Sequence, residues 1–260
     1  MTRYGFRRIL QHEDASARIR TTLFAVTEAL HQAFLLIATL DRDLIEIIVL
    51  SLRVSLSAVV LAALIGLPLG ALLATRRFAG RTFLTIIVNT LMGLPPVVVG
   101  LLVYLWLSAS GPLGALQLLY TPAAMIIAQF ILVAPILIAL TRQVVADLDI
   151  EMGEQLAILG AGPMQRALTL LYEGRAALLT AFLAGFGRAI AEVGAVLIVG
   201  GNINHVTRTM TTAIALETSK GELALAMALG LVLILMAGLI NAAATALGNA
   251  DRPIRALQGK

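Results

Sequence analysis

The sequence is poor in cysteine, lysine and charge. Among 260 residues there is no cysteine, there are two lysines, and charged side chains make up 13% of the total. A chain without cysteine has no disulfide framework, thiolate metal site or thiol nucleophile. Soluble domains carry about 25% charged residues, whereas this chain is 59% hydrophobic. That excess would expose large apolar patches to water, so the composition nearly excludes a soluble enzyme and indicates a membrane protein.

Apolar windows predict the fold class. A membrane-spanning helix needs about 20 mostly apolar residues, and such windows cover residues 47–74, 83–109, 121–141, 176–200 and 223–248. Only Arg53, Arg188 and Glu192 are charged residues inside them. Each buried charge costs about 2.5 kcal/mol or more, so these three are the first functional candidates. We expect an all-α transmembrane fold with five core membrane-spanning helices.

Arginines between the spans predict the orientation. They concentrate between the first two spans (residues 75–82), in the connection 142–175 and in the tail 249–260, whereas the loop 110–120 is uncharged. The positive-inside rule therefore places the connection, the tail and the C-terminus in the cytoplasm, and the loops 110–120 and 201–221 outside. The basic pI, about 10.0, reflects this topology, and we expect no nucleic-acid partner.

The N-terminal region leaves two readings open. Residues 1–22 form an extension with several arginines, and residues 23–42 contain Glu28, His31 and Gln32 on one helical face. This polar face favours an interfacial amphipathic helix lying on the bilayer. A sixth span, which would move the N-terminal arginines into the cytoplasm, is the alternative.

A cytoplasmic helical hairpin is predicted at residues 151–172. Gly160 is suited to a left-handed cap that ends a first short helix, and Pro163 to the first turn of a second. Apolar Leu156, Ile158 and Leu159, together with acidic side chains, indicate a surface that docks in a groove of another protein. The acidic residues are Asp147, Asp149, Glu151 and Glu154.

This hairpin resembles the EAA motif of permease subunits of ATP-binding-cassette (ABC) importers, through Glu154 followed by Gly160 and Ala161. In that family the segment forms coupling helices that rest on the cytoplasmic ATPase. The resemblance assigns ATPase coupling to Glu151, Glu154, Gly160, Ala161, Gly162 and Pro163.

Three further segments resemble the molybdate/tungstate branch of these permeases. They are Gly93–Gly100, Gly185–Asn202 and Leu216–Gly221, and the last two look most like tungstate permeases. The resemblance implies a type I ABC importer permease domain over residues 44–248 of a prokaryotic cell membrane. It also implies an extracytoplasmic oxyanion-binding protein and ATPase subunits that use ATP and magnesium. Because five spans without an internal repeat make half a symmetric pore, we expect a second copy of the chain.

Pro95 and Pro96 predict a break inside the second span. Adjacent prolines remove two helical N–H donors and free the carbonyls of Leu91 and Met92. The resemblance places this break beside the translocation gate, as a hinge, and a static kink is the alternative. Arg188 and Glu192, four residues apart, can neutralise each other, either as a structural ion pair or along the anion path.

Two other regions contain candidate anion contacts. Arg53, flanked by serines at a spacing of two, could attract an oxyanion with the hydroxyls as further donors, or could extend to the outer headgroups. The outer loop 201–221 offers Asn202, Arg208 and several threonines to a tetrahedral anion or a docked protein. His205 has no second histidine nearby, so no metal site is expected.

Missing motifs exclude a source of energy within the chain. There is no G-x-x-x-x-G-K-[ST] phosphate loop and no hydrolase nucleophile motif. We therefore expect a transport subunit that is not an enzyme and binds no cofactor. Tungstate is the first expected substrate and molybdate the second. A sulfate-type permease, a gradient-driven secondary anion transporter and a membrane scaffold are the alternatives.

Overall fold

The computed structural model describes residues 27–76 and 78–250, and every regular element in these ranges is a helix. A first helix covers residues 27–38. The others are α2 (Arg42–Thr75), α3 (Arg81–Met92), α4 (Pro96–Leu107), the 3-10 turn η1 (Gly114–Leu116), α5 (Pro122–Ile158), α6 (Pro163–Glu173), α7 (Arg175–Ile190), α8 (Gly194–Gly200), α9 (Met210–Lys220) and α10 (Leu223–Ala250).

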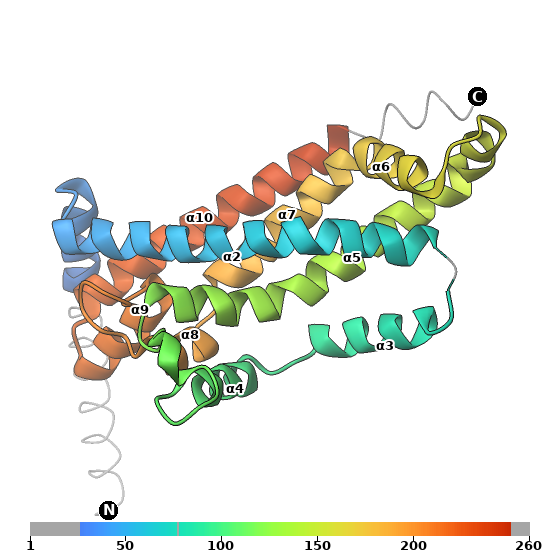
Figure 1. Ribbon diagram of the computed structural model, residues 1–260. Helices are drawn as coiled ribbons and strands as arrows, with labels where there is room; N and C mark the ends of the chain where they lie inside the picture. Colours follow the sequence, from blue (N-terminus) through green and yellow to red (C-terminus); the bar gives the residue numbers. More distant parts are fainter. Residues whose placement is uncertain (1–26, 77, 251–260) are drawn as a thin grey trace, which may run out of the picture.

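The number of membrane crossings agrees with the sequence. Helices α2, α5 and α10 are each long and apolar enough to cross a membrane, and the bent pairs α3–α4 and α6–α7 bring the possible crossings to five. In Figure 1, α2, α5 and α10 run in one direction, and α3–α4, at the lower edge, and α7 run in the opposite direction. The expected all-α fold is confirmed, and five is the largest number of crossings that these helices allow. The pair α6–α7 covers residues 163–190, whereas the expected fourth span is 176–200.

Helix α2 and helix α5 form the centre of the structure, side by side. The Asp41 carboxylate caps α2 by accepting bonds from the N–H groups of Asp43 and Leu44, both 3.1 Å long. Close to the other end of α2, a Cβ on Gly70 would lie 2.6 Å from the Thr141 Cβ of α5. Glycine is therefore what allows the two backbones to approach here.

The second span breaks where its prolines predict. Helix α3 ends at Met92, α4 begins at Pro96, and the two helices are bent by 100°. The carbonyl of Leu91, freed from helical bonding, accepts the N–H of Leu94 at 3.2 Å. The expected single stretch 83–109 is thus two short helices, because two N–H donors are missing at one place.

The expected separation between the third span and the hairpin is wrong. The sequence predicted a span ending at residue 141 and a new helix from residue 151, whereas α5 continues unbroken to Ile158. Residues 142–150 contain neither glycine nor proline, and Val145 and Leu148 are buried against the end of α2 and against α6. Apolar packing therefore keeps residues 142–150 helical, although this segment is more polar than the span before it.

The fourth span and the outer loop also differ from expectation. The stretch 176–200 is divided into α7 and α8, which are separated at residues 191–193. The region 201–221, expected as a loop, contains helix α9. Its start is capped by Thr209, whose N–H donates to the Thr212 hydroxyl at 3.0 Å. Short polar caps of this kind begin helices without changing the hydropathy of a segment.

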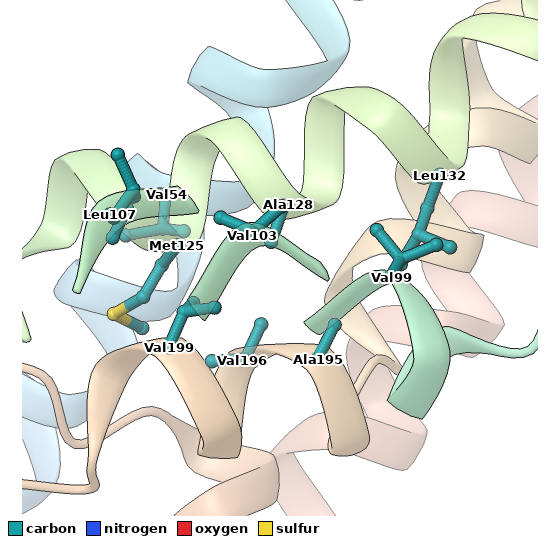
Figure 2. Close-up of a cluster of buried hydrophobic side chains, with 11 residues drawn as sticks. Val54, Val99, Val103, Leu107, Met125, Ala128, Leu132, Ala195, Val196 and Val199 are labelled. Carbon is teal, nitrogen blue, oxygen red and sulfur yellow. The ribbon is translucent and has the colours of Figure 1, made fainter. Parts of the chain in front are cut away.

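The largest apolar cluster joins four helices and fixes the two short ones. Figure 2 shows side chains of α2, α4, α5 and α8 meeting in it. Its buried members are Val54, Val99, Val103, Leu107, Ala124, Met125, Ala128, Leu132, Ala195, Val196 and Val199. Helices α4 and α8 are thereby packed against each other and against α5.

Of the predicted interfacial helix 23–42, residues 27–42 are described, and the helix there ends at residue 38. Its polar residues line one face, where the Gln32 amide donates to Glu28 at 3.1 Å, and Ala33 is buried against the bundle. Phe34 is 63% exposed. The extension 1–22 and most of the tail 249–260 lie outside the described residues.

Candidate coupling surface and translocation path

The turn of the hairpin has the predicted geometry. Gly160 has φ +73, and its N–H and that of Ala161 donate to the carbonyls of Ala157 and Leu156 at 3.0 and 2.9 Å. These two bonds form a Schellman motif, which ends a helix on a left-handed glycine. Pro163 occupies the first turn of α6, as predicted. The turn thus directs α6 away from α5 at a defined angle.

The tip of this hairpin presents large apolar side chains to solvent. Ile158 is 86% exposed, Leu159 80% and Met164 69%. The Glu151 and Glu154 side chains are exposed beside them, and their carboxylates have no hydrogen bond or ion pair with any described residue. Apolar side chains at this exposure, rimmed by carboxylates, are typical of a protein docking surface. We call residues Glu151, Glu154, Ile158, Leu159 and Met164 the tip surface.

Two residues assigned to docking have other roles. Leu156 is half-buried and packs within the hairpin. Asp149 accepts a hydrogen bond from the Arg166 guanidinium of α6 at 2.5 Å, so its charge is already neutralised. Sequence reasoning missed this pair, because nothing in a linear spacing of seventeen residues indicates it.

The break between α7 and α8 is organised by Glu192, which is 5% exposed. One carboxylate oxygen accepts the Arg188 guanidinium at 2.8 Å, and the other accepts the Ala195 N–H of α8 at 3.1 Å. Its main-chain carbonyl accepts the Thr211 hydroxyl at 2.7 Å. Glu192 therefore joins α7, α8 and α9, and its geometry favours the structural interpretation of the Arg188–Glu192 pair.

A glutamine that the sequence did not single out supports the same break. The Gln129 amide nitrogen on α5 donates to the Ala189 carbonyl at 2.9 Å, close to the end of α7. Gln129 is 3% exposed. A buried amide bonded to a helix-terminal carbonyl satisfies a group that the break leaves free. No signal in a single sequence separates it from a surface glutamine.

The expected convergence of Arg53 with Ser51 is wrong. Arg53 is exposed on α2, whereas Ser51 is buried, donates to the Ile47 carbonyl at 2.7 Å and accepts the Met210 N–H of α9 at 2.8 Å. Residues two apart on a helix point in different directions. In the single chain, the Arg53 side chain therefore points away from the other helices. The Ser51 hydroxyl holds the start of α9 on α2.

The donors of the outer loop are bonded mainly within the loop. The Asn202 amide donates to the Thr212 carbonyl at 3.3 Å, and the Thr207 hydroxyl donates to the Gly200 carbonyl at 2.6 Å. The Arg208 guanidinium lies 3.6 Å from Glu217, a buried carboxylate that also binds Lys220 at 3.1 Å. Asn202 and Arg208 thus shape the loop, and Arg208 is not available as a free cation for an anion.

The same end of the molecule brings three potential metal ligands together. Ligand atoms of Asp43, Glu46 and His205 lie within 4.8 Å of one another, and the His205 Nδ1 is 2.9 Å from a Glu46 oxygen. They line a pocket of about 10 Å³ together with Asn204 and Arg208. The guanidinium opposes a second cation there. The contact therefore serves first to tie the loop to α2.

Comparisons with known proteins place the chain among transport components. Residues 66–250 match the family model described as binding-protein-dependent transport system inner membrane component. The chain is 43% identical over 204 residues to a probable anion ABC transporter permease protein of Haloferax volcanii, covering 76% of this chain and 88% of the relative.

Two further relatives carry a more specific name, tungstate uptake system permease protein TupB. The one from Peptoclostridium acidaminophilum is 42% identical over 217 residues, which is 84% of this chain and 95% of the relative. The one from Campylobacter jejuni is 42% identical over 222 residues, 85% of this chain and 93% of the relative. The likeness thus extends over nearly the whole of each relative.

Proposed function

The chain belongs to the family of binding-protein-dependent transport system inner membrane components, and from this premise we propose that it is the permease subunit of an ATP-driven ABC importer. The cargo is a tetrahedral oxyanion, tungstate first and molybdate second, carried into the cytoplasm. The supporting observation is 42% identity to two tungstate uptake permeases over more than four fifths of the chain. Since the chain has no phosphate loop, a partner ATPase binds ATP and magnesium.

The tip surface is where we place the ATPase. Its apolar residues are exposed, and its carboxylates Glu151 and Glu154 have no described partner within the chain. The turn Gly160–Pro163 holds the two arms so that both contribute to this surface. Docking would bury Ile158 and Leu159, each about 1.5–3 kcal/mol when fully removed from water.

The translocation path runs between two copies of the chain in this proposal. Arg53 is exposed and the Arg188 side chain is 41% exposed in the single chain, although both lie within predicted spans. A guanidinium facing lipid at mid-membrane costs about 2.5–3.5 kcal/mol. Contact with a water-filled path or with a second copy of the chain avoids this cost for both guanidinium groups. Pro95 and Pro96 then form a hinge beside this path.

On the opposite side, the outer loop receives an oxyanion-binding protein. Because Asn202 and Arg208 are used inside the loop, they would act by holding its shape. The side chains presented outward include Ile203 and Val206, each 44% exposed. The arginine distribution along the chain supports a position of this loop outside and of the C-terminus in the cytoplasm.

Uptake measurements test the function. The chain is expressed with ATPase and binding-protein genes found beside it, reconstituted in vesicles, and supplied with tungstate, molybdate or sulfate. We expect ATP-dependent accumulation of tungstate, measured by mass spectrometry of the metal. Accumulation driven by an ion gradient without ATP would instead support a secondary transporter, and preferred uptake of sulfate would reject the assigned substrate.

A glycine substitution tests the docking surface. Gly160→Asp places a side chain at φ +73 and a charge beside the exposed apolar tip, so we expect loss of ATPase association in pull-downs with normal membrane insertion. Gly221→Asp is the matched control, since it places the same side chain at φ +84 with nothing within 4 Å of its Cβ, at the end of the loop 201–221 and away from the tip surface. Unchanged association of the Gly160 variant would remove the tip surface from the proposal.

An arginine substitution tests the path. Arg53→Ala should lower tungstate uptake, because the exposed guanidinium is the cation that α2 offers to an anion. Stability should change by less than about 0.5 kcal/mol, as for other exposed positions. Uptake at the rate of the unsubstituted protein would show that Arg53 only contacts headgroups.

A further inference from the structure

The two arms of the hairpin are connected away from the tip by a second contact. The Arg166 guanidinium of α6 donates to the Asp149 carboxylate of α5, and the two side chains are 29% and 19% exposed. Both residues lie outside the turn and outside the tip surface. Their contact can therefore fix the two arms relative to each other without contacting a docked protein. A charge-assisted bond that is shielded from most of the solvent is stronger and more directional than one on an open surface.

Gly153 provides the room for this contact. A Cβ built on Gly153 would lie 2.4 Å from an Arg166 guanidinium nitrogen and 3.2 Å from its central carbon. The guanidinium therefore lies directly against the α5 backbone, between Gly153 and Asp149. Glycine is a poor helix former, costing about 1 kcal/mol relative to alanine, so its presence within α5 calls for a reason, and the seat for Arg166 supplies one.

Apolar packing continues the junction on the same face of α6. Leu170, one turn beyond Arg166, is fully buried against Ala71, Ala74, Val145 and Leu148. A Cβ on Gly174 would approach a Val144 methyl group to 2.9 Å. The end of α6 is thus held firmly on α5. Among the described side chains, the Asp149–Arg166 pair is the ionic connection between the two arms.

We propose that Asp149, Gly153 and Arg166 form a clamp that makes the end of α5 and α6 move as one body when the ATPase pushes on the tip surface. This inference rests on the proposed function. Without the clamp, displacement of the tip would open the angle between the arms instead of moving α5. Asp149, Gly153 and Arg166 are therefore positioning residues, needed for coupling transport to ATP hydrolysis and not for binding the ATPase.

Three different substitutions release the clamp in three ways. Asp149→Asn removes the negative charge, Arg166→Gln removes the positive charge, and Gly153→Ala displaces the guanidinium by size alone. Gly153→Ala is the most informative of the three. Alanine is a better helix former than glycine, so a defect of this variant cannot come from a weaker α5 helix. Gly230→Ala, where the new Cβ meets nothing within 4 Å, and Arg175→Gln, an exposed arginine at the end of the same hairpin, are matched controls.

The test compares tungstate transported per ATP hydrolysed with ATPase association in pull-downs. In reconstituted vesicles we expect normal association and a fall in the transport ratio of about fivefold for each clamp variant, the size associated with one partly shielded ion pair. The controls should behave as the unsubstituted protein. The combined exchange Asp149→Arg with Arg166→Asp should recover most of the ratio.

A distance measurement examines the clamp on the permease alone. Spin labels at Ile150→Cys and Leu168→Cys, both exposed positions, should give a narrow distance distribution that broadens with Gly153→Ala. Normal transport ratios, an unchanged distribution, or clamp variants that lose ATPase association would each overturn the clamp. Failure of the unsubstituted permease to associate with the ATPase would overturn the proposed function, whatever the spin labels show.

Discussion

The chain interrupts two of its spans, and it does so by different chemistry. Between α3 and α4 the interruption comes from the backbone, since Pro95 and Pro96 have no N–H to donate. Between α7 and α8 it comes from a side chain, since Glu192 supplies a buried acceptor to the first turn of α8. The first break is encoded by residues at the break itself, and the second by contacts with other helices.

The surroundings of the two breaks differ in the same way. The start of α3 is fastened, since α3 contacts α5 and the Arg81 guanidinium donates to the Leu73 and Ala74 carbonyls of α2. None of the residues of α3 is buried, however, and its last residues before the proline break are exposed, so this side of the break is held loosely. Both sides of the Glu192 break are fixed, through Gln129 and Ile190 before it and Ala195 after it. The two breaks meet where α4 packs on α8. The comparison indicates that the α3–α4 break is movable and the α7–α8 break is fixed, and that the two are in contact through α4 and α8.

The largest expected effect is at the fixed break. Glu192→Ala leaves the Ala195 N–H and the Arg188 guanidinium without their acceptor, which we expect to lower stability by about 2–3 kcal/mol. Thermal unfolding in detergent measures this. Arg188→Gln should cost less, because that side chain is 41% exposed and reaches water. Equal losses for both variants would mean that Glu192 does not organise the break.

A smaller effect is expected at the contact between the breaks. A Cβ on Gly100 of α4 would lie 2.8 Å from the Ala195 Cα of α8. Because a backbone atom cannot move aside, Gly100→Ala should cost about 1–3 kcal/mol. Gly238→Ala, with open space around the new Cβ, is the control. If the two variants unfold at the same temperature, the close contact between α4 and α8 does not contribute to stability.

The smallest effect on stability is expected at the movable break. The double substitution Pro95→Ala with Pro96→Ala restores two N–H donors, and unfolding should change by less than about 1 kcal/mol because α3 buries no residue. Spin labels at Leu84→Cys and Leu105→Cys should move apart as the 100° bend relaxes. An unchanged distance would show that packing of α4, and not proline, maintains the bend.

Features encoded at one place in the chain were predictable. Pro95–Pro96 predicted the break, Gly160 the left-handed cap, and Pro163 the first turn of α6, because each acts on its own backbone. Apolar windows predicted the number of spans. They failed for residues 142–150, since hydropathy reports the preference for lipid and not the continuity of a helix.

Features that depend on distant residues were not predictable. His205 pairs with Glu46, which lies 159 residues away, and Ser51 bonds the Met210 N–H over the same separation. Arg208 was expected to face an anion, but it lies beside the buried Glu217. A single sequence does not contain these pairings, so it identified which side chains were polar without showing which were already bound.

The continuity of α5 has a mechanical consequence. Its 37 residues make a rod of about 55 Å at 1.5 Å per residue. The close approach of Gly70 to Thr141 lies about halfway along this rod, and buried side chains of α5 pack against α2 on either side of it. A push of a few ångströms at the hairpin would thus reach the other end of the same helix without any relay through loops.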